Sequence, residues 1–165
     1  TLGYSISAEA IQSGLSSAVW PGRLTCLRKE PLFFIDGAHN EDASRRLRES
    51  IEAYFPGKRL IYIMGVFRDK EYEKIADILG PLASSIHTVD LPDAGRTLPA
   101  PELAAVMQRH CMPGASIRPE ESISKAVAHA LKEADTGDVI LAFGSLSYLG
   151  KVMELTNYKG YEKYD

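Results

Sequence analysis

The feature that most limits how this chain can fold is an alternation between short, almost wholly apolar runs and longer amphipathic segments. The apolar runs at 32–35, 59–64 and 138–143 have the length of strands and are hydrophobic at nearly every position. Strands of this kind are buried on both faces, as in parallel sheets that are covered by helices. The alternation therefore predicts an α/β fold, a Rossmann-like and mostly parallel sheet with helices on both faces.

Hydrophobic residues recur at helical spacing between these runs. The expected helices are 7–17, 41–55, 72–82, 101–111, 123–131 and 146–155, and shorter strands are expected at 24–28, 85–91 and 115–118. The short segment Lys29-Glu30-Pro31 separates the expected strand at 24–28 from the apolar run at 32–35. This spacing predicts a β-hairpin at one edge of the sheet.

Composition excludes several classes of partner. The 165 residues suffice for one domain with a substantial core. With 19 basic and 22 acidic side chains, the net charge of −3 disfavours a nucleic-acid or acidic-membrane partner. Since no apolar stretch reaches the roughly 18 residues of a membrane span, no transmembrane segment is expected. Cys26 and Cys111 lack metal-site spacing; we expect a reduced, cytoplasmic protein, with a single disulfide as the alternative.

Three of the expected strands end in polar or glycine-rich turns. These turns are Asp36-Gly37-Ala38-His39-Asn40, residues 65–70, and residues 144–148. The carboxyl ends of parallel strands meet at one edge of a sheet, where open α/β folds bind their ligands. We therefore expect these turns to form one site. The ordinary alternative is that Asp36 and Asn40 cap the next helix, that Ser145 is also a cap, and that Lys70 is a surface charge.

Several well-known signatures are absent from the sequence. It contains no Gly-x-x-x-x-Gly-Lys-Ser/Thr phosphate loop, and no Gly-x-Gly-x-x-Gly follows the first apolar strand. It also shows no Ser-His-Asp order and no His-Cys metal spacing, so we predict no metal-ligating residue. The chain thus offers a ligand-binding edge without a complete apparatus for phosphate, which another part of the protein must supply.

Four motifs, taken in order, resemble the C-terminal domain of folylpolyglutamate synthases, including the bifunctional dihydrofolate synthases, of the Mur ligase superfamily. They are Trp20-Pro21-Gly22-Arg23, Asp36-Gly37-Ala38-His39-Asn40, the run from Gly65 to Tyr72, and Gly144-Ser145-Leu146. Glu71 departs mildly from the Asp-Lys-Asp-Tyr pattern of the family.

This resemblance implies an ATP-dependent amide ligase. ATP phosphorylates the folate carboxylate, and the amine of L-glutamate then attacks the acyl phosphate. The phosphate loop, the Mg²⁺ ligands and most of the folate site would belong to an N-terminal ATPase domain of the same chain, which fits a sequence that begins with Thr1. Residues 1–22 would then be the end of that domain and the linker, 23–155 the C-terminal domain, and 156–165 a frayed tail. The isolated piece would be inactive.

The resemblance also implies roles for individual residues of the nucleotide site. Arg23 would reach the ATP phosphates from the linker, as suits a forked and permanently charged side chain. Asp36 would bind the ribose. Asn40 would line the ATP site, and His39 would be the catalytic residue between the domains.

In the same way, the resemblance implies that Lys70 and Ser145, with Tyr148 beside them, bind the incoming glutamate. Two alternatives remain open. The chain could belong to a Mur-type ligase that builds cell-wall peptides, or it could be a stand-alone nucleotide-binding module. The Trp-Pro-Gly-Arg motif and the Asp-Lys-Glu-Tyr run favour the folate enzyme.

Overall fold

The computed structural model of the protein describes residues 5–18 and 22–158. The strands are β1 (Thr25–Lys29), β2 (Leu32–Ile35), β3 (Leu60–Met64), β4 (Ser85–Thr88), β5 (Ser116–Pro119) and β6 (Val139–Phe143). The helices are α1 (Ala8–Ser16), α2 (Glu41–Tyr54), α3 (Tyr72–Leu79), α4 (Ala100–His110), α5 (Ile123–Glu133) and α6 (Leu149–Leu155), and the 3-10 turn η1 (Gly80–Leu82) follows α3.

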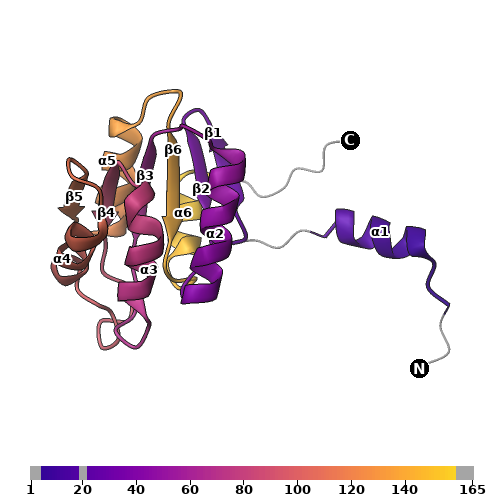
Figure 1. Cartoon of the computed structure of the whole chain (residues 1–165), viewed down its shortest axis with the longest axis horizontal. Coiled ribbons are helices and arrows are strands. Elements are labelled where there is room, and N and C mark those ends of the chain that lie inside the picture. The colour runs from indigo at the N-terminus through magenta and orange to yellow at the C-terminus, as the bar shows by residue number, and fades with distance from the viewer. Residues whose placement is uncertain (1–4, 19–21, 159–165) are drawn as a thin grey trace.

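These strands form one sheet in the order β1-β2-β6-β3-β4-β5. β1 runs antiparallel to β2 as an edge hairpin, and every other neighbouring pair is parallel. The helices α2 and α3 cross the sheet on the near face in Figure 1, while α5 and α6 lie behind it. The predicted α/β architecture is therefore confirmed, including the hairpin at the edge.

The central strands divide their side chains between two apolar layers, because successive residues of a strand point to opposite faces. In β6, Leu141 and Phe143 join the layer that α2, α3 and α4 cover, whereas Ile140 and Ala142 join the layer that α5 and α6 cover. β3 is buried along its whole length in the same alternating way. This two-sided burial explains why the apolar runs of the sequence are continuous.

The position of β6 creates a crevice at the carboxyl edge of the sheet. β6 is the last strand in the chain, yet it lies between β2 and β3. The helix that follows β6 packs on one face of the sheet, and the helices that follow β2 and β3 pack on the other. In open α/β sheets, ligands bind where the connections diverge in this way.

Some boundaries differ from the sequence-based prediction. β4 ends at Thr88, although a strand was expected over 85–91, and the last helix begins at Leu149 although its expected range was 146–155. The motif residues Trp20 and Pro21, and residues 159–165 of the expected tail, lie outside the described residues.

The first helix forms as expected but adds nothing to either apolar layer. Ser7 caps α1 by accepting a hydrogen bond from the N–H of Ala10, and no residue of α1 is buried. None of the helices in the described part of the chain is long and apolar enough to cross a membrane.

Candidate functional site

The three polar turns meet at the carboxyl edge of the sheet. The N–H of Gly144, just after β6, donates to the carbonyl oxygen of Ala38 at 2.9 Å, and the N–H of Gly65 lies 3.4 Å from the oxygen of Phe143. Gly144 has a φ of 111°, and a Cβ there would lie 2.3 Å from the oxygen of Gly65. Only glycine permits so close an approach with this backbone conformation. The predicted convergence of the turns at one edge is therefore present.

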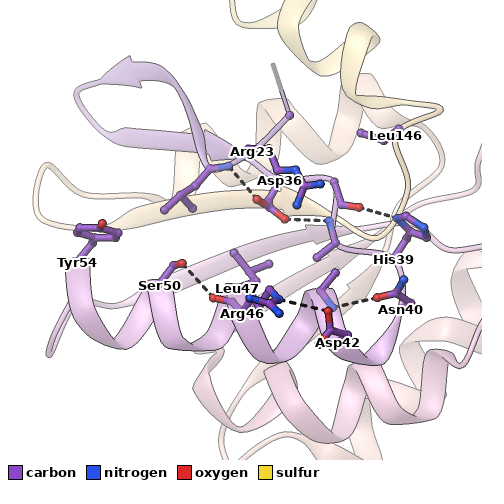
Figure 2. Close-up of a pocket in the computed structure, with 15 residues that line it drawn as sticks. Arg23, Asp36, His39, Asn40, Asp42, Arg46, Leu47, Ser50, Tyr54 and Leu146 are labelled. Atoms are coloured by element: carbon purple, nitrogen blue, oxygen red, sulfur yellow. Dashed lines mark hydrogen bonds and ion pairs between the residues drawn. The ribbon is translucent and has the colours of Figure 1, made fainter. Parts of the chain in front are cut away.

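A pocket of about 640 Å³ lies between the turn after β2, the start of β1 and the side of α2. Figure 2 shows it extending from Tyr54, near the end of α2, to His39 and Asn40 at the beginning of that helix. Arg23 and Asp36 lie side by side on the wall opposite α2. The volume is in the range typical of sites for small molecules and cofactors.

Asp36 connects the residues just before β1 to this turn. Its Oδ2 accepts a hydrogen bond from the N–H of Leu24, and its Oδ1 accepts one from the N–H of Ala38, both at 2.8 Å. Burial raises the pKa of Asp36, although these two N–H groups and the positive charge of Arg23 act in the opposite direction. Each carboxylate oxygen can accept a second hydrogen bond, so the structural role leaves room for a ligand hydroxyl.

His39 and Asn40 are both held by local hydrogen bonds. The Nδ1 of His39 lies 2.7 Å from the carbonyl oxygen of Gly37. Because a carbonyl can only accept, Nδ1 carries the proton and Nε2 is the ring nitrogen left for another partner. The Oδ1 of Asn40 accepts from the N–H of Ala43 and so caps α2. Any ligand contact of Asn40 would therefore come from its amide nitrogen.

A second pocket, of about 260 Å³, adjoins the first. It lies over the turns after β6 and β3, and Lys70 and Ser145 both line it. His39 and Leu146 line both pockets. The structure therefore brings together two of the three residues that were expected to bind glutamate, and it places His39 where the two pockets join.

The third of these residues, Tyr148, is not in the pocket. Its side chain is fully buried, and its hydroxyl lies 2.7 Å from the carbonyl oxygen of Phe143 and 2.9 Å from that of Ile63. Both oxygens belong to the ends of strands beneath the site. The structure therefore differs from the expectation for Tyr148: its side chain fastens the last helix to β6 and β3 and is not among the residues that line the pocket.

Ser145 is present at the pocket, but not as a helix cap. α6 begins four residues later, and its cap position is Tyr148. The Oγ of Ser145 instead lies 2.9 Å from the Oγ of Ser147 and accepts a hydrogen bond from the N–H of Ser147. The turn after β6 is thus held by its own serines.

Sequence reasoning missed Arg96, which also lines the second pocket. It lies in the loop before α4, which a bridge between Phe67 and Thr97 holds against the turn after β3. The guanidinium of Arg96 lies 4.3 Å from the centre of the Phe67 ring and pairs with Asp69 at 3.2 Å. A lone arginine in a loop of glycine and proline carries no local signal, because contacts between two loops distant in sequence, such as the hydrogen bond from the N–H of Arg68 to the carbonyl oxygen of Arg96, bring it near Lys70.

The two pockets suit different chemical groups. The larger pocket offers the cation of Arg23 for phosphate and the carboxylate of Asp36, which can accept hydrogen bonds from hydroxyl groups. The smaller pocket combines two cations with a hydroxyl, a set that suits a carboxylate. A molecule in one pocket would meet a molecule in the other beside His39.

Comparison with known proteins shows what the chain as a whole is similar to. Residues 22–146 match the family described as Mur ligase, glutamate ligase domain. The dihydrofolate synthase/folylpolyglutamate synthase of Bacillus subtilis is 37% identical over 91 residues, which cover 54% of this chain and 21% of the relative. The folylpolyglutamate synthase of Lacticaseibacillus casei is 29% identical over 153 residues, covering 93% of this chain and 33% of the relative.

Among solved structures, a bifunctional folylpolyglutamate synthase/dihydrofolate synthase with Mn, AMPPNP and L-glutamate bound is similar with a TM-score of 0.80 and 28% identity. The match covers 94% of this chain and 36% of that one. This chain therefore spans about a third or less of the length of these relatives.

Proposed function

The chain belongs to the Mur ligase family, as its glutamate ligase domain, and we propose that it is the C-terminal domain of a cytoplasmic, ATP-dependent ligase that adds L-glutamate to folates. In this reaction ATP phosphorylates a folate carboxylate, and the amine of glutamate displaces the phosphate to form an amide. The names of the bifunctional relatives support dihydrofolate synthesis as a second activity, for which we propose dihydropteroate as the substrate.

One observation carries this proposal: the two pockets meet at His39. In the larger pocket, Arg23 would bind ATP phosphates, Asp36 would accept from the ribose hydroxyls, and Asn40 would contact the nucleotide through its amide nitrogen. A forked guanidinium fits phosphate oxygens, and a carboxylate accepts from hydroxyl groups. Nucleotide held there would present its terminal phosphate toward the second pocket.

In the smaller pocket, Lys70, Arg96 and Ser145 would hold the carboxylates of the incoming glutamate. The amine would then lie beside the Nε2 of His39, which can accept a proton as the amide bond forms. Much of the rate enhancement would come from holding the two reactants together and from excluding water from an acyl phosphate that hydrolyses readily.

The residues of these pockets do not fit a metal ion. Both oxygens of Asp36 accept backbone N–H groups, and Asp42 pairs with Arg46 at 3.2 Å. Magnesium requires several oxygen ligands in near-octahedral geometry. We therefore assign the Mg²⁺ ligands, the phosphate loop and most of the folate contacts to an N-terminal ATPase domain of the same protein.

The test uses the complete enzyme that carries this domain, assayed for glutamate ligation with ATP, tetrahydrofolate and L-glutamate. Lys70→Ala and Ser145→Ala should each raise the KM for glutamate, by about tenfold or more for the charged Lys70, and leave the KM for ATP unchanged. Lys74→Ala is the matched control, because Lys74 pairs with Glu41 and Glu71 outside both pockets.

An unchanged KM for glutamate in Lys70→Ala and Ser145→Ala would contradict the assignment of the smaller pocket. Ligation of an amino acid to a cell-wall precursor, with no activity on tetrahydrofolate or dihydropteroate, would favour the cell-wall ligase instead. A native protein without a phosphate loop before residue 1 would favour the stand-alone nucleotide-binding module.

A further inference from the structure

A cluster of histidine and glutamate side chains lies at the opposite edge of the sheet from the larger pocket. His87 is in β4, Glu120 directly follows β5, and His129 is in α5. The Nδ1 of His87 lies 2.7 Å from Oε1 of Glu120, and the Nδ1 of His129 lies 2.9 Å from both oxygens of that carboxylate. One potential ligand atom from each of the three residues lies within 4.8 Å of the other two.

Two of these three side chains are deeply buried. The side chains of His87 and Glu120 are 1% and 4% exposed, whereas that of His129 is 40% exposed. The buried pair supplies a fixed imidazole and a fixed carboxylate, and the open side at His129 leaves access for an ion and a water molecule. Burial alone would raise the pKa of Glu120, but the hydrogen bonds from His129 and His87 lower it below its usual value.

A second carboxylate orients His87 from behind. The Nε2 of His87 lies 3.2 Å from Oε2 of Glu133, and the same oxygen accepts a hydrogen bond from the hydroxyl of Ser85. The other oxygen of Glu133 pairs with Arg59. A carboxylate on the far nitrogen is the usual support of a metal-binding histidine, because it fixes the ring and keeps the near nitrogen available for the metal. Glu133 is not one of the three proposed ligands, and its contact with His87 points to the same use.

We propose that His87, Glu120 and His129 form a binding site for a divalent transition-metal ion, with zinc as the ion that fits best. Two imidazoles and one carboxylate, with a water as the fourth ligand, are a recurrent ligand set for zinc. Magnesium and calcium prefer ligand sets made wholly of oxygen, so they fit this cluster poorly. None of the three residues lines the two pockets of the proposed ligase site, so this inference does not depend on that function.

The distances from each histidine to Glu120 require only a small adjustment. In a tetrahedral site with bonds of about 2.0–2.1 Å, neighbouring ligand atoms lie roughly 3.3 Å apart. The ion would replace the protons that now join the imidazoles to Glu120, so the contacts of 2.7 and 2.9 Å would open by about half an ångström. Binding would thereby link β4, the end of β5 and α5, and would release protons.

The test is calorimetric titration of the metal-free 165-residue chain with zinc chloride. We expect about one ion per chain, with micromolar or tighter affinity and a higher unfolding temperature when zinc is present. His129→Ala and Glu120→Gln should each weaken the affinity by about tenfold or more. Cobalt bound in place of zinc should show the intense visible absorption of a tetrahedral site, which His129→Ala should abolish.

The matched control is His110→Ala. His110 also contacts two carboxylates, those of Glu73 and Asp77, but it does so on the surface between α3 and α4. Its loss should leave the zinc affinity unchanged. No saturable binding, or binding that is lost in His110→Ala and retained in His129→Ala, would overturn the proposal. Because His129 is partly exposed, its variant should fold, and unfolding curves without metal check this directly.

Discussion

At the scale of single residues, two tyrosines show that the contribution of a buried hydroxyl to stability depends on its neighbours. Tyr62 and Tyr148 are both fully buried, and burial raises the pKa of both phenols. Each hydroxyl therefore stays protonated and needs an acceptor. The hydroxyl of Tyr148 has two carbonyl oxygens within reach, whereas that of Tyr62 has no hydrogen-bond partner among the described residues.

Replacing these tyrosines by phenylalanine should have opposite effects. Tyr62→Phe removes an unsatisfied polar group and keeps the edge-to-face contact with Phe143, so the free energy of unfolding should rise by about 1 kcal/mol. Tyr148→Phe removes the hydroxyl that donates to these strand-end carbonyl oxygens and should lower it by about 1–2 kcal/mol. Urea unfolding of both variants checks this. A loss of stability in Tyr62→Phe would show that its hydroxyl has a partner.

Asp36 should make stability depend on pH. Because burial raises its pKa in the folded state, the folded chain binds this proton more tightly than the unfolded chain. The contribution of Asp36 to the free energy of unfolding is therefore fully present below the ordinary aspartate pKa. It declines as the pH rises through the higher, folded-state pKa. The difference in free energy of unfolding between the wild type and Asp36→Asn should fall with rising pH across that window. A difference that rises would contradict the direction of the shift.

At the scale of elements, the beginning of α2 serves both the fold and the site. The side chain of Asn40 caps the helix, and the backbone carbonyl oxygen of Asn40 accepts from the hydroxyl and the N–H of Ser44. The negative charges of Glu41 and Asp42 in the first turn suit the positive end of the helix dipole. A ligand in the larger pocket therefore meets a helix start that local hydrogen bonds have already ordered.

Two substitutions separate the cap from the ligand contact. Asn40→Ala should lower the free energy of unfolding by about 1 kcal/mol, because the N–H of Ala43 loses its acceptor. Asn40→Ser keeps a capping oxygen and should restore most of that stability, but it lacks the amide nitrogen. In the complete enzyme, both variants should therefore raise the KM for ATP. An unchanged KM for ATP in Asn40→Ser would show that Asn40 only caps the helix and does not contact the nucleotide.

At the scale of the whole molecule, stability comes from the sheet and the helices on its two faces. The central strands β3 and β6 are buried along their full length between these layers. α1 is different: Ile11 and Leu15 on this helix are 53% and 73% exposed, and none of its residues is buried. The described contacts thus give α1 no part in holding the α/β unit together.

Removing residues 1–17 should consequently leave the α/β unit intact. We expect the free energy of unfolding to change by less than about 0.5 kcal/mol, as for surface changes that remove no buried contact. Chemical unfolding of the truncated and complete chains provides the measurement. A loss well beyond that value would show that α1 packs on the sheet in solution.

The sequence by itself determined the class of fold and the order of its elements. Burial on two faces makes inner strands continuously apolar, and helices on a sheet show their own period, so both signals are local. It also indicated the polar turns at Asp36, Lys70 and Ser145. Parallel strands always bring their carboxyl ends to one edge, which is why this part of the site could be predicted.

Only the tertiary structure decided which side chains line the two pockets. Tyr148 lies in the core and not at the pocket, with its hydroxyl near the carbonyl oxygens of Ile63 and Phe143. A bridge between two loops places Arg96 at the smaller pocket. His87 and His129 lie close together because β4 lies beside β5 beneath α5. Contacts between residues tens of positions apart leave no periodic trace in a chain, so strand order and packing alone set them.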